Sequence, residues 1–325
     1  MGRILCVLTE APAPAGVDPP RRDLSPLRYP GGKRRMSPFI ATLFRLSGAS
    51  AIMEPFAGGA SVSLTLVENG LAAEAAIADA DPLVAAFWST VFSTEAALLA
   101  EMVSEAVLDV SEWRRQKALS PRSRLESAYK LLYLNRTSFS GSLKSNTGPL
   151  GGMAGAATGL IASRFNREAL ACRIVAISAL RDRVMWVRCG DWRETVAQAS
   201  GFGRKPFIYL DPPYFAKSGR LYPRHFNDAD HRDLASYVMG DPGAPWALSY
   251  DRHPDAEAAY GAHPGYAVVG MVHTAGRRAV RDEIVVSDVI GKARRTGALP
   301  RSGRYSLPVR REDWVRFDEV MPAVA

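Results

Sequence analysis

Short apolar segments that stop at proline, glycine or aspartate recur along this chain, and their order predicts alternating strands and helices. Residues 50–56 read as a strand, because the apolar run stops at Pro55 and glycines follow. The glycines turn the chain, and residues 61–67 can start a helix. A second apolar run, residues 75–78, ends at Asp79. This order is a βαβ unit, so we predict a parallel sheet and an α/β fold.

The second half of the chain resumes this pattern after a helix-rich stretch. Helices are predicted across residues 83–134, where Ser123 and Glu126 form a capping box. Residues 138–159 are rich in Gly, Ser and Asn and are too polar for a core. We therefore predict one α/β domain that is interrupted by a helical, basic insertion. Its further strands are expected at residues 184–187, 206–210, 246–249 and 283–287.

The same patterns divide the chain into parts. A flexible Pro-rich leader is expected at residues 1–24, which contain the run APAPAGVDPPRRD. The α/β domain is expected at residues 25–89 and 164–287, with the helical insertion at residues 90–163 between its two halves. Residues 288–325 are expected to be a basic C-terminal extension.

The charge, hydrophobicity and cysteine and histidine content of the chain indicate which kinds of binding partner to expect. The 325 residues include 41 Lys or Arg and 33 Asp or Glu, which gives a formal net charge of +8. A basic balance makes polyanions the first partners to consider. No apolar run reaches the length of about 18 residues that a membrane helix needs, and the 3 cysteines and 5 histidines lack metal-ligand spacing. We expect a cytoplasmic protein with no membrane segment and no metal.

The most specific motif is Asp211-Pro212-Pro213-Tyr214, which directly follows the apolar run PFIYL. Two prolines end the preceding strand, because proline cannot donate a ladder hydrogen bond. Ligands of α/β sheets bind at the carboxyl ends of the strands, so the motif predicts a rigid pair of acceptors at such a site. A plain strand-ending turn is the simpler alternative for the same residues.

An exocyclic amine on an aromatic base is a group that suits this pair of acceptors. Its nitrogen is a weak nucleophile, because the lone pair is delocalised into the ring. The Asp211 carboxylate and the Pro212 carbonyl can each accept one N–H, which concentrates electron density on the nitrogen. The carboxylate or solvent can then take the proton after methyl transfer. Tyr214 offers a flat face for a base that has left the stack.

Two glycine-containing motifs precede this one. In EPFAGGA, residues 54–60, small residues let the backbone approach a ligand, and Asp79 at the end of the next strand can bind a pair of ribose hydroxyls. In RYPGGK, residues 28–33, a tight turn carries Tyr29 for stacking and Lys33 for a carboxylate. Each motif alone also fits a packing turn or a basic loop, but their joint occurrence favours a binding site.

Two basic segments lie before and after the Asp211–Tyr214 motif along the chain. Residues 112–144 contain eight Lys or Arg and two Glu, and residues 277–316 contain eleven Lys or Arg against five acids, so each carries a net charge of +6. Charge runs are usually solvated faces. Two of them around a base-binding site favour contacts with phosphates.

Taken together and in this order, the motifs resemble the Dam-like, alpha-group (D12 class) DNA adenine N6-methyltransferases, over residues 24–287. The resemblance implies an α/β, Rossmann-like S-adenosylmethionine-dependent methyltransferase fold with a helical target-recognition insertion. It also implies S-adenosylmethionine as methyl donor and double-stranded DNA as substrate. The catalytic residues that it implies are Asp211, Pro212, Pro213 and Tyr214. The cofactor-binding residues that it implies are Tyr29, Lys33, Glu54, Phe56, Gly58, Asp79, Asp191 and Asp211.

The resemblance also carries over to the start of the target-recognition segment, at residues 135–144. It implies that Arg136 and Phe139 contact the DNA backbone or a base, and that Lys144 reads a guanine edge in the major groove. The Gly/Ala-rich residues 147–159 match no recognition hairpin, so GATC specificity does not carry over. We expect a monomer.

Other functions are compatible with parts of the pattern. Methylation of cytosine N4 also requires a weakly nucleophilic exocyclic amine to react, but that activity more often goes with Ser in place of Asp in the tetrapeptide. Methylation of cytosine C5 resembles chemistry with a Pro-Cys nucleophile, and no such dipeptide is present. A DNA-binding module without catalysis is disfavoured by four intact motif residues, Lys33, Asp79, Asp211 and Tyr214. A nicotinamide oxidoreductase is disfavoured by the glycine pattern.

Overall fold

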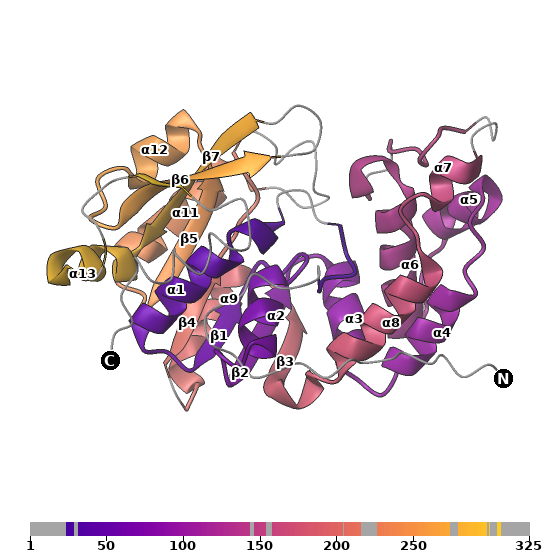
Figure 1. The fold of residues 1–325 in the computed structure, drawn as a ribbon, viewed down its shortest axis with the longest axis horizontal. Coiled ribbons are helices and arrows are strands. Elements are labelled where there is room, and N and C mark those ends of the chain that lie inside the picture. The colour runs from indigo at the N-terminus through magenta and orange to yellow at the C-terminus, as the bar shows by residue number, and fades with distance from the viewer. Residues whose placement is uncertain are drawn as a thin grey trace.

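One sheet forms the centre of the protein in the computed structural model, which describes residues 24–28, 32–143, 146–153, 158–203, 205–215, 226–273, 279–297, 299 and 304–306. Tyr29, Lys144 and nearly all of the expected leader lie outside these residues. In the described part, eight strands pair in the order β3-β2-β1-β4-β5-β7-β6-β8 (Figure 1). They are β1 (Ala51–Glu54), β2 (Glu74–Asp79), β3 (Val184–Cys189), β4 (Pro206–Leu210), β5 (Trp246–Asp251), β6 (Tyr266–His273), β7 (Ala279–Ser287) and β8 (Arg304–Ser306).

Strands β1 to β5 are parallel, whereas β7 runs antiparallel to both β5 and β6. The chain order reverses at β1, because β2 lies on one side of it and β4 on the other. Ligands of open α/β sheets bind at such a reversal, beyond the carboxyl ends of the strands. Since β7 is antiparallel, its first half lies at the same edge of the sheet and can contribute side chains there.

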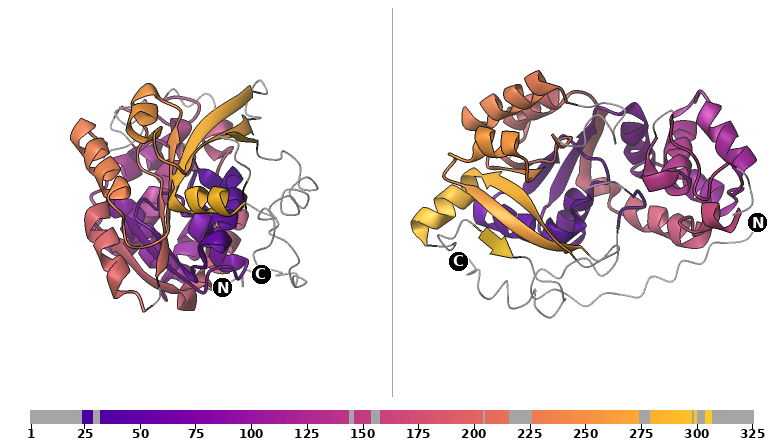
Figure 2. Two further views of the ribbon diagram at one scale, coloured as in Figure 1. Left: turned by 90° about the vertical axis from the view of Figure 1, so that its left-hand side faces the viewer. Right: turned by 90° about the horizontal axis from the view of Figure 1, so that it is seen from above.

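Helices cover both faces of the sheet (Figure 2). On one face, α1 (Ser37–Ser47), α2 (Ser61–Glu68) and α13 (Asp288–Thr296) share a core with Phe207 and Tyr209 of β4. On the other face, Ile208 and Leu210 pack with α9, α11 and α12. This alternation along β4 is the period-two pattern of a strand that is buried on both sides. The three helices of the second face are α9 (Trp192–Ala197), α11 (Asp228–Met239) and α12 (Pro254–Tyr260).

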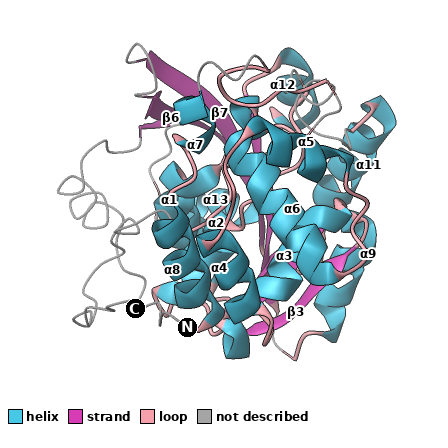
Figure 3. Ribbon diagram, turned by 90° about the vertical axis from the view of Figure 1, so that its right-hand side faces the viewer, coloured by secondary structure: helices cyan, strands magenta, loops and turns pink. Residues whose placement is uncertain are grey.

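A helical unit stands beside the sheet (Figures 1 and 3). In it α3 packs against α6, and α4 packs against α8. Its longest helix begins at the predicted cap, where Ser123 Oγ accepts the Glu126 N–H at 3.1 Å. The reciprocal half of the predicted capping box is not formed, because Glu126 Oε2 accepts the Arg122 N–H at 2.6 Å instead. The unit comprises α3 (Pro82–Val91), α4 (Ala96–Ser104), α5 (Val110–Ala118), α6 (Arg124–Thr137), α7 (Thr158–Ala162) and α8 (Arg167–Ser178).

Three of the boundaries expected from the sequence do not match the way the elements pack. The expected start of the insertion at residue 90 falls inside α3, which packs as a whole with the helical unit against α6. The insertion was expected to end at residue 163, but α8 continues the helical unit to Ser178. The α/β domain was expected to end at residue 287, but α13 buries Val289, Ile290 and Ala293 in the core, and β8 adds a strand beside β6. Residues 288–297 and 304–306 therefore belong to the sheet domain, although the segment is basic. Lys292 and Arg295 are exposed on α13 while Val289, Ile290 and Ala293 are buried, as in other amphipathic helices.

No single helix in the described part is long and apolar enough to cross a membrane. Helices α3 and α4 reach the required length and apolar composition only when taken together, and they are bent by 105° relative to each other.

Candidate active site

The Asp211-Pro212-Pro213-Tyr214 motif begins where β4 ends, at the reversal point of the sheet. Leu210 is the last paired residue, and the prolines prevent the ladder from continuing. Asp211 therefore projects at the carboxyl edge, between β1 and β5.

Lys33 is the closest ionic partner of Asp211. Its Nζ lies 2.6 Å from Asp211 Oδ1, and it also donates to the Tyr214 hydroxyl. The lysine belongs to η1 (Lys33–Arg35), a short helix immediately before α1, and its carbonyl accepts a hydrogen bond from Ser37 Oγ at 3.0 Å. The side chain is almost wholly buried. The structure thus joins the first and the last motif of the sequence in one ion pair.

Glu283 is a third charged member of this cluster, and sequence reasoning did not identify it as a site residue. Its Oε2 lies 3.5 Å from Lys33 Nζ, and its Oε1 accepts a hydrogen bond from the Tyr214 hydroxyl at 3.3 Å. The residue lies on β7, opposite Asp251 of β5. The signal in the sequence was a single glutamate at the start of the apolar run IVV within a predicted strand. Only the antiparallel placement of β7 brings it to the site.

Two hydroxyl groups fix the other side of Asp211. Ser249 Oγ donates to Asp211 Oδ1 at 3.1 Å, and the Tyr209 hydroxyl lies 2.8 Å from Ser249 Oγ. Because the serine has one proton and gives it to the carboxylate, Tyr209 donates to the serine. Among the described residues, the hydrogen bonds and ion pairs of this carboxylate all reach Oδ1. Oδ2 remains as an acceptor for a ligand.

Burial sets the protonation behaviour of the cluster. Burial alone would lower the pKa of Lys33, but the charges of Asp211 and Glu283 outweigh it and hold that pKa well above its ordinary value. Burial raises the pKa of Asp211, while the nearby ammonium opposes the increase. Burial likewise raises the pKa of Glu283. The cluster therefore combines the ammonium of Lys33, which stays charged, with two carboxyl groups whose pKa values burial raises.

The glycine turn after β1 is tied to the end of β2 by Asp79, the acid for which the sequence predicted a contact with ribose hydroxyls. Asp79 Oδ2 accepts the Gly58 N–H at 2.8 Å, and its Oδ1 accepts the Asp81 N–H at the same distance. Trp88 Nε1 donates to the Gly58 carbonyl at 2.9 Å. Gly58 has φ +45° and Ala60 has φ +48°, so the turn uses the left-handed region twice. Asp79 stabilises this conformation.

Glu54 lies beneath the same turn rather than on its surface. It is 3 % exposed, and its Oε2 accepts the N–H of Ser63 in the first turn of α2 at 3.1 Å. Burial raises the pKa of Glu54 to about 8, although the hydrogen bonds from Ser63 oppose the increase. At neutral pH this group is largely protonated in the described structure.

Aromatic rings gather between the first strand and α9. The Phe56 ring centroid lies 6.4 Å from that of Trp192 and 5.5 Å from that of Phe226. Asp191, at the carboxyl end of β3, caps α9 by accepting the Arg193 N–H at 2.8 Å. The predicted residues Phe56 and Asp191 are thus brought to the same side of the sheet edge.

Tyr214 differs from the open stacking surface that the sequence suggested. Its ring is only 6 % exposed, and its hydroxyl lies between Lys33 and Glu283. The next residue, Phe215, is half-buried and stacks on His231 with a centroid distance of 3.7 Å. The Tyr214 hydroxyl therefore connects Lys33 with Glu283, and the buried ring offers no open stacking surface.

The three residues implied in DNA contact do not form one described surface. Phe139 is 67 % exposed on η2 (Phe139–Gly141), whereas Arg136 Nε turns inward and donates to the Pro26 carbonyl at 2.6 Å. Neighbouring Asn135 accepts the Arg28 N–H at 2.7 Å and donates to the Arg28 carbonyl at 3.0 Å. The end of α6 thus holds the segment just before the Tyr29–Lys33 motif. Lys144 lies outside the described residues.

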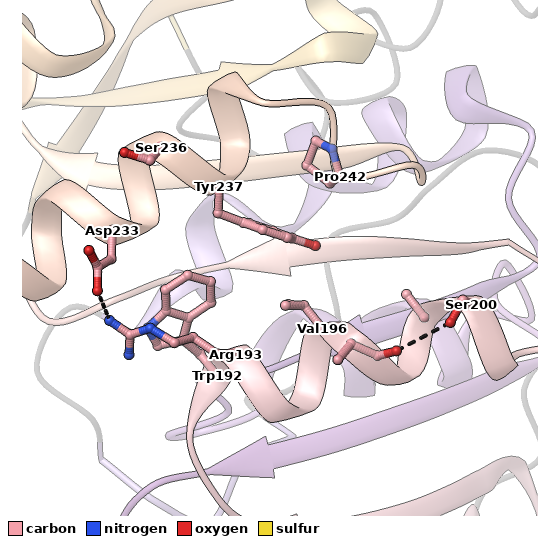
Figure 4. A pocket seen from close by; sticks show the side chains of 10 residues that line it. Trp192, Arg193, Val196, Ser200, Asp233, Ser236, Tyr237 and Pro242 are labelled. Atoms are coloured by element: carbon pink, nitrogen blue, oxygen red, sulfur yellow. Dashed lines mark hydrogen bonds and ion pairs between the residues drawn. The ribbon is translucent and has the colours of Figure 1, made fainter.

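A groove of about 660 Å³ lies between α9 and α11 (Figure 4). It shares no lining residue with the Lys33–Asp211–Glu283 cluster, and Arg193 crosses it to reach Asp233. It is lined by Trp192, Arg193, Val196, Ala197, Ala199, Ser200, Asp233, Ser236, Tyr237 and Pro242. Among the described residues, no group of three or more His, Cys, Asp or Glu side chains could hold a metal ion.

The parallel sheet with its reversal at β1, the antiparallel β7 and the glycine turn tied to Asp79 define an α/β fold of the S-adenosylmethionine-dependent methyltransferase type. Residues 29–263 match the model of the D12 class N6 adenine-specific DNA methyltransferases, and the chain belongs to this family. No curated protein matches the chain in a sequence comparison. The protein is thus an adenine-specific DNA methyltransferase, and the resemblance seen in the sequence is confirmed.

Proposed function

We propose that this protein transfers a methyl group from S-adenosylmethionine to the N6 amine of adenine within a short sequence of double-stranded DNA. The observation that carries the proposal is the state of Asp211. Its Oδ1 is held by Lys33 and Ser249, while Oδ2 has no partner among the described residues. A fixed carboxylate with one open oxygen is suited to accept an N–H of an amine.

The cluster has the charge that a sulfonium cofactor requires. Two acids face the single ammonium of Lys33, so the ionised cluster carries one excess negative charge that a cation would balance. S-adenosylmethionine supplies an electrophilic methyl group when it is bound. The residues proposed to hold it are Tyr29, Lys33, Glu54, Phe56, Gly58, Asp79, Asp191 and Asp211.

Two of these residues have a more specific proposed role. The rings around Phe56 offer an apolar surface for a purine, and the Asp79 carboxylate suits ribose hydroxyls. Glu54 supports the turn from below through its bond to Ser63.

The residues of the motif would act on the target amine directly. Asp211 Oδ2 and the Pro212 carbonyl each accept one N–H, which orients the nitrogen and increases its electron density. When a methyl group from S-adenosylmethionine is transferred there, its bond to sulfur would break and leave a neutral thioether, and Asp211 or water would accept the proton that the amine loses. Positioning and electrostatics supply the catalysis, so no covalent enzyme intermediate is needed.

A base in a duplex cannot reach this buried edge of the sheet, so the target adenine must leave the stack. The exposed Phe139 and the basic residues of α5 and α6 are proposed to contact the DNA, together with Lys144. Arg114 and Arg122 are exposed members of this basic segment. Arg136 supports the segment before Tyr29 instead.

The test is to express the protein in a bacterial host without DNA methylation and to sequence its DNA with single-molecule detection of modified bases. We expect N6-methyladenine at one short motif. N4-methylcytosine instead would favour the other amine substrate. If no modified base is found, a calorimetric titration with S-adenosylmethionine decides between another substrate, which requires binding, and an inactive DNA-binding module, which does not.

A further inference from the structure

Glu283 is a buried charged residue that the proposed function uses only for the net charge of the cluster, and that has no assigned effect on the target amine. It lies on β7 between β5 and β6, opposite Asp251 on one side and Val269 on the other. It is 8 % exposed, and β7 is otherwise apolar from Ile284 to Val286. An ionisable group in such a strand destabilises the fold unless its contacts compensate.

The contacts of Glu283 do not satisfy it fully. Its Oε1 accepts one long hydrogen bond from Tyr214, at 3.3 Å. Its Oε2 is buried without a hydrogen-bond donor among the described residues, and Lys33 Nζ is 3.5 Å away. A polar group retained only for stability would be expected to have closer partners, because each buried unsatisfied oxygen costs free energy.

The arrangement has a clear effect on Asp211. Lys33 lies between the two carboxylates, at 2.6 Å from one and 3.5 Å from the other. The negative charge of Glu283 also interacts with the Lys33 ammonium, so the ammonium stabilises the negative charge of Asp211 less strongly. The Glu283 charge also repels the Asp211 charge directly. Without Glu283, Lys33 would pair with Asp211 alone, and the carboxylate would become a weaker acceptor and a weaker base.

We propose that Glu283 is a positioning residue, which holds the Lys33 ammonium and the Tyr214 hydroxyl so that Asp211 keeps its negative charge available to the target amine. This inference rests on the proposed function, since it concerns the acceptor strength of Asp211. It adds to that function a residue from the far, antiparallel part of the sheet. Glu283 touches neither the amine nor the methyl donor in this scheme.

The test compares Glu283→Gln with the matched control Asp282→Asn. Gln keeps the shape of the side chain and an oxygen for the Tyr214 hydroxyl, but removes the charge. Asp282 is the adjacent residue on the opposite face of β7, and it pairs with Arg252 at 3.3 Å. Methyl transfer to DNA, the KM values for cofactor and DNA, and the pH dependence of kcat are measured for both variants.

For Glu283→Gln we expect kcat to fall about tenfold with little change in the KM for DNA, because the loss concerns the reacting group. The acidic limb of the kcat profile should move to lower pH, since removing a negative neighbour lowers the pKa of Asp211. Asp282→Asn should match the wild type in both respects. The other titratable groups that face Asp211 are unchanged: Lys33 on η1, Glu54 on β1, Tyr209 on β4, Tyr214, and Tyr250 on β5.

A second readout needs neither cofactor nor DNA. In protein labelled with ¹³C at aspartate carboxyl carbons, the Asp211 resonance, assigned by its loss in Asp211→Asn, is followed against pH. Its titration should move to lower pH in Glu283→Gln and remain in place in Asp282→Asn. A purely structural role for Glu283 predicts no such directed shift.

The outcomes separate the two proposals. A wild-type protein that does not methylate adenine defeats the proposed function, whatever the variants show. An active wild type with an unchanged kcat and an unchanged Asp211 titration in Glu283→Gln defeats the role of Glu283 alone. If Glu283→Gln does not fold, Glu283→Asp replaces it, because the shorter chain withdraws the carboxylate from Lys33. A kcat equal to that of the wild type in this variant would overturn the proposal.

Discussion

Lys33 and Asp211 form a buried ion pair with 2.6 Å between Nζ and Oδ1, although one residue precedes the first strand and the other follows the fourth. The pair fixes one carboxylate oxygen and leaves the other without a partner among the described residues. It therefore links the N-terminal glycine motif to the DPPY motif through a direct contact. The geometry of this ion pair depends on a small number of further contacts, each of which can be removed by substitution.

Asp211→Asn tests the reacting group itself. We expect methyl transfer to fall by about a hundredfold or more, because the amide cannot accept a proton and carries no charge. DNA binding, measured by fluorescence anisotropy, should change little. Asp182→Asn, at a side chain that is 89 % exposed, is the control and should behave as wild type. An Asp211→Asn protein with normal turnover would exclude Asp211 from the chemistry.

Ser249→Ala tests the support of Asp211. It removes the donor to Oδ1 and leaves the Tyr209 hydroxyl without its acceptor, so we expect about 1–3 kcal/mol less stability in urea unfolding and a lowered kcat. Tyr209→Phe removes only the outer donor and should cost less in both measurements. Ser127→Ala on α6, whose hydroxyl bonds to the Ser123 carbonyl, is the control. Equal effects in Ser249→Ala and Ser127→Ala would contradict this assignment.

Glu54→Gln tests the buried carboxyl beneath the glycine turn. Burial raises the pKa of Glu54 from its ordinary 4.5 to about 8, so between these pH values the folded protein retains a proton that the unfolded chain releases. The free energy of unfolding should therefore fall as pH rises across this window. The wild type should lose stability relative to Glu54→Gln between pH 5 and pH 8, as measured by urea unfolding. A difference that is independent of pH would show that Glu54 does not titrate there.

Asn135→Ala tests the attachment of the helical unit to the segment before Tyr29. Its side chain makes two hydrogen bonds to the Arg28 backbone and a third to the Gly141 carbonyl at 3.3 Å. We expect a loss of about 1–3 kcal/mol of stability and a raised KM for the cofactor, because the Tyr29–Lys33 motif is held less firmly. Asn166→Ala, which removes only the N-cap of α8, is the control and should leave this KM unchanged. A KM that responds equally to both variants would refute the specific link.

Some of the site follows from the sequence because its causes are local. Proline after an apolar run ends a strand wherever that strand lies, so β4 was predicted at residues 206–210, as observed. The glycine turn and Asp79 lie in one βαβ unit, whose geometry joins them without help from the rest of the chain. The motif order indicated the family, which the family model confirms.

Other parts depended on distant segments. Strand β6 was not predicted, and its role becomes clear only in the sheet, where it pairs with β7 over its own full length. The C-terminal segment looked like a basic extension, but Ile290 and Ala293 of α13 complete the core next to α1. The resemblance implied a DNA contact for Arg136, yet its Nε donates to the Pro26 carbonyl at 2.6 Å.

The sequence by itself thus determined the α/β class, the strands that end at proline or aspartate, and the family to which the chain belongs. The tertiary structure decided which of the motif residues meet. It paired Lys33 with both Asp211 and Glu283, buried Tyr214 between them, and set Ser249 against one carboxylate oxygen. The physical reason is range: turn and strand signals act over a few residues, whereas charge balance in a buried cluster depends on side chains that only the order of strands in the sheet brings together.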